Sequence, residues 1–201
     1  KGDLEEIRRL IEEGAEVSND EYKAIIGVCS EGNLEVLKCV IELADIRAED
    51  VRRLELLHAA CYVGSIEVVR YLFEELPGGG LTVDDVRKDG CPAFSMGHLP
   101  IVQYFFEELP GGGLTTDDVL NGAMLFLACT NGRLAIVQYL VEDVPGRGLT
   151  ADDVSKGNRM LHRCIVERSE IAQYLVDTFP ELERTPLGTI HGYHAQFPPP
   201  K

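Results

Sequence analysis

The chain has 201 residues, of which 34 are acidic and 19 are basic, so its formal net charge is −15. This length suits one domain or one array of repeats with a substantial core. A surface of this sign repels nucleic-acid phosphate and anionic lipid, so we expect neither a nucleic acid nor a membrane as a partner. No apolar run reaches the roughly 20 residues of a membrane span, and the first residues show no secretory leader pattern.

A short motif, glycine followed two residues later by Leu or Ile and then by an amphipathic run, recurs along the chain. The gaps between successive copies are close to 33 residues, and the glycines are Gly2, Gly32, Gly64, Gly97 and Gly132. Such a period is the signature of stacked two-helix units. Glu167 stands where the next glycine is due, and loss of packing residues is expected of an end repeat.

The segment after each glycine is predicted to be an amphipathic helix. In residues 66–76 the apolar side chains recur at steps of three and four, and residues 101–109 and 136–144 repeat the pattern. Pro100 falls in a first turn, where proline is tolerated. A tyrosine stands at the same place in four of these helices, at Tyr71, Tyr104, Tyr139 and Tyr174.

A shorter helix is predicted before each glycine, most clearly in residues 56–63. A cysteine stands three residues before the glycine position in four copies, at Cys29, Cys61, Cys129 and Cys164. Neighbouring members of such a column lie about 10 Å apart, too far to share a metal ion. We therefore expect small buried thiols, no metal and no cofactor, and reduced thiols favour a cytoplasmic protein.

The sequence Glu-Leu-Pro-Gly-Gly-Gly-Leu-Thr occurs at 75–82 and again at 108–115, with a shorter relative at 145–150. A phosphate-binding loop is one interpretation, but the loop lacks a lysine and acidic pairs follow it. The alternative is a joint between repeats. Proline stops one helix, the glycines allow the reversal, Leu81 or Leu114 packs back on the stack, and threonine caps the next helix.

An acidic pair follows each joint, in the aligned segments 18–21, 47–50, 82–85, 115–118 and 150–153. Four of these five begin with Ser or Thr, which predicts a capping box, although Asp is expected to reach back less well than Glu. A compatible second interpretation is an acidic ridge that receives a Lys- or Arg-rich segment. Asp84, Asp117 and Asp152 are the candidates for that ridge.

Two regions depart from the pattern. Repeat three has Gly90 and Pro92 where other copies have helix formers, which predicts a shortened first helix, and Phe94 takes the cysteine position. Tolerated variation and a role in binding are both open explanations. Residues 184–201 form an irregular, Pro-rich tail whose His191 and His194 lack a third metal ligand nearby.

Residues 56–60 read Leu-Leu-His-Ala-Ala and residues 64–72 read Gly-Ser-Ile-Glu-Val-Val-Arg-Tyr-Leu. Together they resemble an ankyrin repeat, although the Thr-Pro that begins the family's first helix is absent from the internal copies. The resemblance implies an all-α, ankyrin-like helical solenoid of about five to six repeats. The approximate repeats are 1–16, 17–46, 47–81, 82–114, 115–149 and 150–183.

The same resemblance implies a module that binds a protein partner through the concave face of its first helices and is not an enzyme. Tyr62, Ser95 and Thr130, each two residues before a repeat glycine, are the candidate concave positions. We expect a monomer whose partner has a basic surface. The alternative is the targeting array of a larger multidomain protein, such as a ubiquitin-ligase adaptor or effector, with no independent activity. No catalytic motif supports an enzyme.

Overall fold

The computed structural model describes residues 27, 32–43, 45–88, 91–121, 124–145, 148–156 and 169–184. Within these ranges all regular structure is helical, comprising twelve α-helices and one 3-10 helix. The all-α prediction is therefore confirmed. Several predicted features lie outside the described residues: the first repeat, the acidic pair at 18–21, Cys29, Cys164, and the tail beyond Arg184 with His191 and His194.

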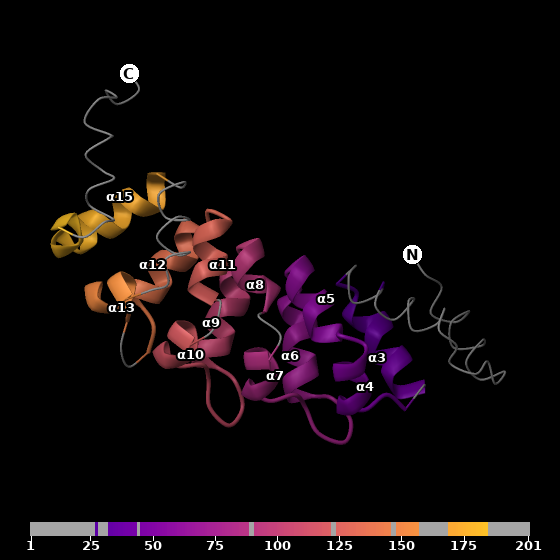
Figure 1. The fold of residues 1–201 in the computed structure, drawn as a ribbon. Coiled ribbons are helices and arrows are strands. Elements are labelled where there is room, and N and C mark those ends of the chain that lie inside the picture. Colours follow the sequence, from indigo (N-terminus) through magenta and orange to yellow (C-terminus); the bar gives the residue numbers. More distant parts are fainter. Residues whose placement is uncertain are drawn as a thin grey trace. The chain divides into compact units, whose positions relative to one another are not determined.

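The chain divides into two compact units (Figure 1). Unit 1 comprises residues 1–93 and 100–113, and unit 2 comprises residues 94–99 and 114–201. The described helices of unit 1 are α3 (Leu34–Leu43), α4 (Ala48–Arg53), α5 (Leu56–Val63), α6 (Ile66–Glu74), α7 (Val83–Lys88) and nearly all of α9 (Leu99–Glu107). Those of unit 2 are α10 (Thr116–Asn121), α11 (Met124–Thr130), α12 (Leu134–Glu142), α13 (Ala151–Lys156), α15 (Ser169–Thr178) and the 3-10 helix η1 (Pro180–Arg184). The short helix α8 (Pro92–Met96) begins in unit 1 and ends in unit 2.

The repeats at 47–81, 82–114 and 115–149 each show three described helices where the sequence predicts two. In the first fully described repeat the expected first helix is split into α4 and α5 at Leu54 and Glu55. The Leu54 N–H still donates to the Asp50 carbonyl, but Glu55 adopts a left-handed conformation with φ of 53°. The turn lets Leu54 and Leu56, only two positions apart, both lie in the core. Because neither Gly nor Pro marks this break, the pattern gives no sign of it.

Helices α5 and α6 form a pair joined by the two-residue turn at Gly64 and Ser65. Gly64 has a φ of 88°, and the N–H groups of both turn residues donate to the carbonyl of Ala60. Gly132 plays the same part between α11 and α12, with a φ of 68°. A left-handed residue at a helix end favours glycine, which explains the glycine that marks each repeat.

The second helix of each repeat buries the predicted apolar stripe. In α6 the buried side chains include Val69, Leu72 and Phe73, and α12 repeats the arrangement in unit 2. Phe73 makes edge-on contacts with the rings of Tyr104 and Phe105 on α9, with centroids about 6 Å apart. Pro100 lies in the first turn of α9, as predicted.

The first helices carry the cysteine positions. Cys61 on α5 and Cys129 on α11 are fully buried and take part in no disulfide, as expected of small core side chains. Phe94 is fully buried at the corresponding position of α8. This helix has five residues, so the prediction that Gly90 and Pro92 shorten it is confirmed.

Candidate interaction surface

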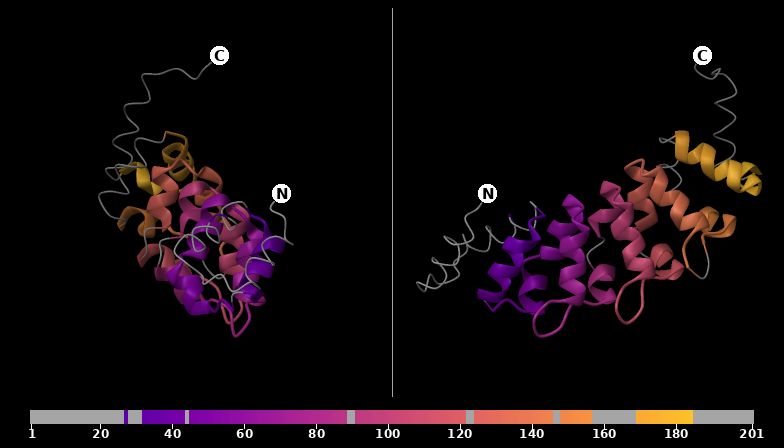
Figure 2. Two further views of the ribbon diagram at one scale, coloured as in Figure 1. Left: turned by 90° about the vertical axis from the view of Figure 1, so that its right-hand side faces the viewer. Right: turned by 180° about the vertical axis from the view of Figure 1, so that it is seen from behind.

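The Pro-Gly-Gly-Gly-Leu-Thr loop is a joint that connects the second helix of one repeat to the first helix of the next, as between α6 and α7 (Figure 2). A Cβ atom on Gly80 would lie 1.9 Å from the Phe73 carbonyl oxygen, and one on Gly148 would lie 1.9 Å from that of Val141. The glycine hydrogen therefore packs directly on the end of the preceding helix. Two residues earlier in the loop, Gly78 has a φ of 82°, so this glycine serves the chain reversal.

The leucine of the loop packs back on the repeat, as predicted. Leu81, Leu114 and Leu149 are each 3 to 5% exposed. The Leu81 N–H donates to the carbonyl of Leu72 at 3.0 Å, and the Leu149 N–H makes the equivalent bond to Leu140. These two N–H groups donate to backbone carbonyls of the protein, so they are not available as donors to a phosphate.

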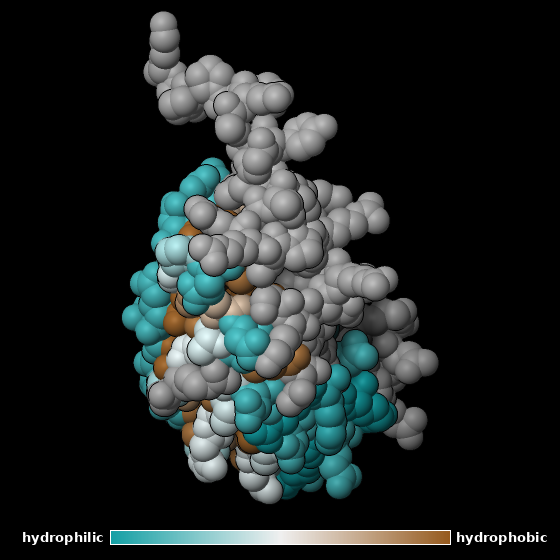
Figure 3. All heavy atoms as spheres, turned by 60° about the vertical axis from the view of Figure 1, so that its left-hand side comes forward, coloured by the Kyte–Doolittle hydropathy of each residue, from teal (hydrophilic) through white to brown (hydrophobic). Residues whose placement is uncertain are grey.

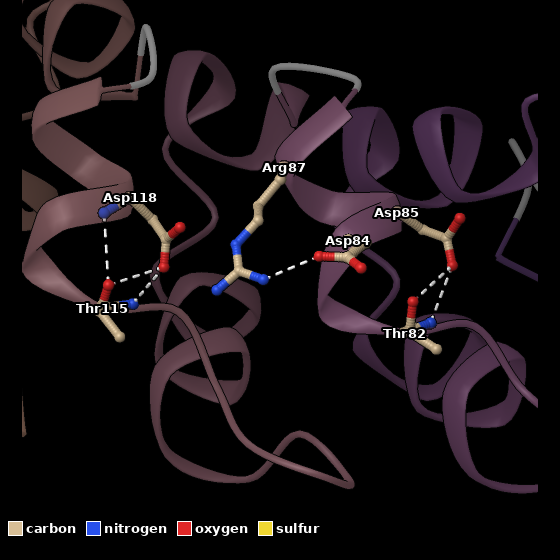
Figure 4. A network of polar contacts seen from close by, with 6 residues as sticks. All are labelled: Thr82, Asp84, Asp85, Arg87, Thr115 and Asp118. Carbon is tan, nitrogen blue, oxygen red and sulfur yellow. Dashed lines mark hydrogen bonds and ion pairs between the residues drawn. The ribbon is translucent and has the colours of Figure 1, made fainter.

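In the three described segments that begin with threonine, the second aspartate of the acidic pair closes a capping box. In α7 the Asp85 carboxylate accepts hydrogen bonds from the Thr82 N–H at 2.8 Å and the Thr82 hydroxyl at 3.2 Å (Figure 4). Asp118 in α10 and Asp153 in α13 accept the same two bonds from their own cap threonines. The capping box predicted for these segments is therefore present in all three. The threonine hydroxyl donates to the carboxylate and thereby supplies a second bond at this short reach.

The first aspartate of each pair points outward. The side chain of Asp84 is 67% exposed and pairs with Arg87 at 2.8 Å, turned away from the cap (Figure 4). Asp117 on α10 and Asp152 on α13 are also exposed. The position three residues after each aspartate differs, however: it is Arg87 in α7, Leu120 in α10 and Ser155 in α13. The short helices α10 and α13 therefore have no arginine at this position.

A bidentate ion pair connects two short helices of unit 1. Arg52 on α4 contacts both carboxylate oxygens of Asp85, at 2.6 and 3.0 Å. Burial raises the pKa of Asp85, but the hydrogen bonds from Arg52 and from the Thr82 backbone outweigh it, so the pKa lies below its ordinary value. Asp85 is thus a structural carboxylate, whereas Asp84 beside it faces solvent.

The three first-helix candidates differ in exposure. Tyr62 on α5 is 55% exposed, next to Val63 at 40% and one turn after the exposed His58. In unit 2, Ser95 and Thr130 are half-buried. The Ser95 carbonyl accepts a bond from Arg133, and the Thr130 hydroxyl donates to the Phe126 carbonyl of its own helix. On the face shown in Figure 3, apolar residues appear only as small patches among hydrophilic ones.

A row of tyrosine and glutamate contacts joins successive second helices, and sequence reasoning missed it. The Tyr104 hydroxyl donates to Glu74 at 2.9 Å in unit 1, and the Tyr174 hydroxyl donates to Glu142 at 2.6 Å in unit 2. Burial, followed by the bond to Glu74, raises the pKa of Tyr104. The sequence shows a tyrosine at the same place in four second helices. A glutamate also stands about one repeat before Tyr104 and before Tyr174, and this recurring glutamate is the signal that could have predicted the contacts.

Cations add to this row in unit 1. The Arg70 guanidinium lies 4.6 Å from the centre of the Tyr104 ring and pairs with Glu108 at 2.6 Å. Lys38 repeats the arrangement one repeat earlier, with its ammonium 5.0 Å from the Tyr71 ring and 2.8 Å from Glu75. These contacts tie second helices together, so this face is structural.

Among the described residues, neither a metal-ligand cluster nor a membrane-spanning helix is present. No group of three or more His, Cys, Asp or Glu side chains there is arranged to hold a metal ion. No helix among the described residues combines the length and apolarity needed to span a bilayer.

Comparison with known proteins gives one clear relationship. The family model for ankyrin repeats matches residues 1–85 and 92–185, in three copies. No curated protein and no solved structure gives a significant match. The match covers most of the chain and coincides with the helical repeats described above. The chain therefore belongs to the ankyrin-repeat family.

Proposed function

We propose that this protein is an interaction module that binds a basic segment of a partner protein through its first helices and its acidic joint edge. Ankyrin repeats generally mediate protein–protein interactions and are typically non-enzymatic binding modules. The partner's chemistry follows from the charge of −15, which favours cationic ligands. The free thiols of the described cysteines support a cytoplasmic location.

The observation that carries the proposal is the division of roles within each acidic pair. The carboxylate of the second aspartate accepts the hydrogen bonds of the capping box. The first aspartate is exposed, and its side chain accepts none of these bonds. A capping role alone needs only one carboxylate at the third helical position. The exposed Asp84, Asp117 and Asp152 are therefore the positions at which we expect a partner's Lys or Arg side chains to be attracted.

The three aspartates do not contribute equally. Arg87 neutralises Asp84 locally, whereas Leu120 and Ser155 replace that arginine beside Asp117 and Asp152. Leu120 is also 37% exposed, so α10 offers an apolar contact next to an acidic one. An apolar residue beside a basic one in the partner matches this combination. We assign the larger share of the charge attraction to Asp117.

On the first helices, Tyr62 is the strongest candidate contact. An exposed aromatic ring next to Val63 offers apolar area and a face for a cation. In this proposal Ser95 and Thr130 contribute packing contacts with the partner. The Thr130 hydroxyl is already bonded within its own helix, so we assign it no hydrogen bond to the partner.

Selection from a random peptide display library tests this function. The immobilised full chain is expected to enrich peptides with Lys or Arg next to an apolar residue. The variant Asp84→Asn/Asp117→Asn/Asp152→Asn should lose that enrichment. The control Glu35→Gln/Glu67→Gln/Glu170→Gln removes the same charge from other exposed positions and should retain it. Equal enrichment by both variants would refute a role for the acidic edge, and enrichment of acidic or neutral peptides by the unmodified chain would refute the basic partner.

A further inference from the structure

The row of contacts between second helices has a cation in unit 1 and a glutamine at the same place in unit 2. Lys38 and Arg70 each stand six residues after a repeat glycine, and Gln138 stands six residues after Gly132. In unit 1 each of these cations lies over the tyrosine ring of the next repeat. Glutamine carries no charge, so α12 offers the next tyrosine no cation from this position.

The other two members of the row are retained in unit 2. Arg70 lies 4.6 Å from the centre of the Tyr104 ring and 3.5 Å from Glu74. The Tyr104 hydroxyl donates to the same glutamate. In unit 2 the Tyr174 hydroxyl donates to Glu142 at 2.6 Å, and this glutamate stands four residues after the glutamine of α12. Unit 2 thus has the ring and the carboxylate of the Arg70 site, with the cation replaced.

Tyr174 also differs from the other tyrosines of the row in its exposure. Tyr174 is half-buried, whereas each of the other three is 3% exposed or less: Tyr71, Tyr104 and Tyr139. The glutamine of α12 and the glutamate bonded to Tyr174 are exposed as well. A side chain of another protein can therefore reach Tyr174 and the carboxylate beside it.

We propose that Tyr174 and Glu142 form a binding site for an arginine side chain of a partner protein, which takes the place that Arg70 has in unit 1. The guanidinium lies over the Tyr174 ring, and Glu142 balances its charge. The structure favours arginine over lysine because Arg70 is the cation that accompanies a tyrosine–glutamate hydrogen bond in unit 1. A guanidinium is also planar and weakly hydrated, which suits stacking on a ring.

This site is separate from the acidic joint edge. It is formed by the second helices α12 and α15, whereas Asp117 and Asp152 lie on the short helices α10 and α13. The inference therefore does not rest on the proposed role of those aspartates, and the two proposals can fail separately.

Nuclear magnetic resonance of the full chain with ¹³C-labelled tyrosine rings tests the site. The probe is N-acetyl-arginine amide, and N-acetyl-citrulline amide is a nearly isosteric probe without the charge. At matched ionic strength we expect saturable shifts of the Tyr174 ring signals with the arginine probe at about 1–100 mM. The citrulline probe should give shifts at least about fivefold smaller. The rings of Tyr71 and Tyr104 already lie under cations and should not shift.

Three variants separate this site from a general effect of charge. Glu142→Gln keeps an acceptor for the Tyr174 hydroxyl but removes the charge, so it should weaken binding of the arginine probe by about three- to tenfold. Gln138→Arg should fill the site from within the chain and abolish the saturable shifts. Ala135→Arg adds the same charge at another exposed position of α12 and should retain them.

Equal shifts with the two probes, or no saturable shift of Tyr174, would overturn the proposal. Both readouts use the unmodified chain, so neither depends on whether a variant folds. Equal effects of Gln138→Arg and Ala135→Arg would also overturn it. The variant Asp84→Asn/Asp117→Asn/Asp152→Asn should leave the Tyr174 shifts unchanged, which distinguishes a failure of this site from a failure of the joint edge.

Discussion

At three positions in the joints, the hydrogen atom of glycine is the only side chain that the backbone accommodates. Gly80, Gly113 and Gly148 each have a carbonyl oxygen of the preceding helix within 1.9 to 2.3 Å of where a Cβ would stand. None of the three has a positive φ, so close approach is the reason for glycine there. The loop is repeated because each repeat needs the same contact between its last helical turn and the returning chain.

Substitution Gly80→Ala should destabilise the protein by about 2–3 kcal/mol, because the loop must move away from the end of α6. The shift in the urea midpoint, followed by circular dichroism, measures the effect. Gly27→Ala is the control: Gly27 is helical and has no atom within 4 Å of the added methyl group. A Gly80→Ala midpoint equal to that of the control would show that the loop is not packed as described.

The Arg52–Asp85 pair gives a pH-dependent prediction. Asp85 has a pKa below its ordinary value, so the pair stabilises the fold above the unfolded-state pKa of about 4 and loses this effect as pH falls through the folded-state value. Arg52→Ala should cost about 1–3 kcal/mol at pH 7, because Asp85 stays buried without its cation. The difference between Arg52→Ala and the unmodified chain should shrink below about pH 4.

Urea titrations at several pH values test this, with Arg53→Ala as the neighbouring control. The Arg53–Asp50 pair is exposed, so its loss should change stability by less than about 0.5 kcal/mol. Equal effects of the two arginine substitutions at pH 7 would contradict the structural role given to Asp85.

At the scale of helices, two tyrosines of the second helices allow the contribution of a hydrogen bond to stability to be measured apart from that of ring packing. The Tyr71 hydroxyl is buried and, among the described residues, has no hydrogen-bond partner, whereas the Tyr104 hydroxyl bonds to Glu74. Both rings lie under a cation. The pair is therefore an internal comparison within unit 1.

Tyr104→Phe should cost about 1 kcal/mol, the net value of a hydrogen bond. Tyr71→Phe should be neutral or stabilising, because it removes a buried hydroxyl without a partner. Thermal unfolding of the two variants side by side measures the difference. A loss in Tyr71→Phe as large as that in Tyr104→Phe would mean that Tyr71 has a partner after all.

The sequence predicts the elements where local chemistry marks them. Glycines with positive φ, such as Gly64, and threonines at caps, such as Thr82, leave visible signals at helix ends. The break at Leu54 and Glu55 leaves none, because burial of Val51, Leu54 and Leu56 by the packed repeat decides it. Contacts between repeats, such as Arg52 with Asp85, are equally hidden, since they join residues 33 positions apart.

At the scale of the whole molecule, the charge pattern varies along the chain. Most of the excess negative charge lies in the sequence of unit 1, but arginines there pair with Asp50, Asp84 and Asp85. In unit 2, Leu120 and Ser155 take the place of Arg87 in the short helices. The sequence pattern predicts the acidic pairs and the first aspartate of each as the ridge candidate, and the structure adds the cap bonds made by the second aspartate in α7, α10 and α13.

The most direct test of the account is the salt dependence of binding to a basic peptide obtained by the display selection. Fluorescence anisotropy gives Kd across a range of NaCl concentrations for the unmodified chain, for Asp117→Asn/Asp152→Asn, and for the control Glu67→Gln/Glu170→Gln. The account predicts that Kd rises with salt, and that the Asp117/Asp152 variant binds more weakly at low salt with a shallower dependence than the control. Binding that is insensitive to salt, or identical salt dependence in the two variants, would contradict it.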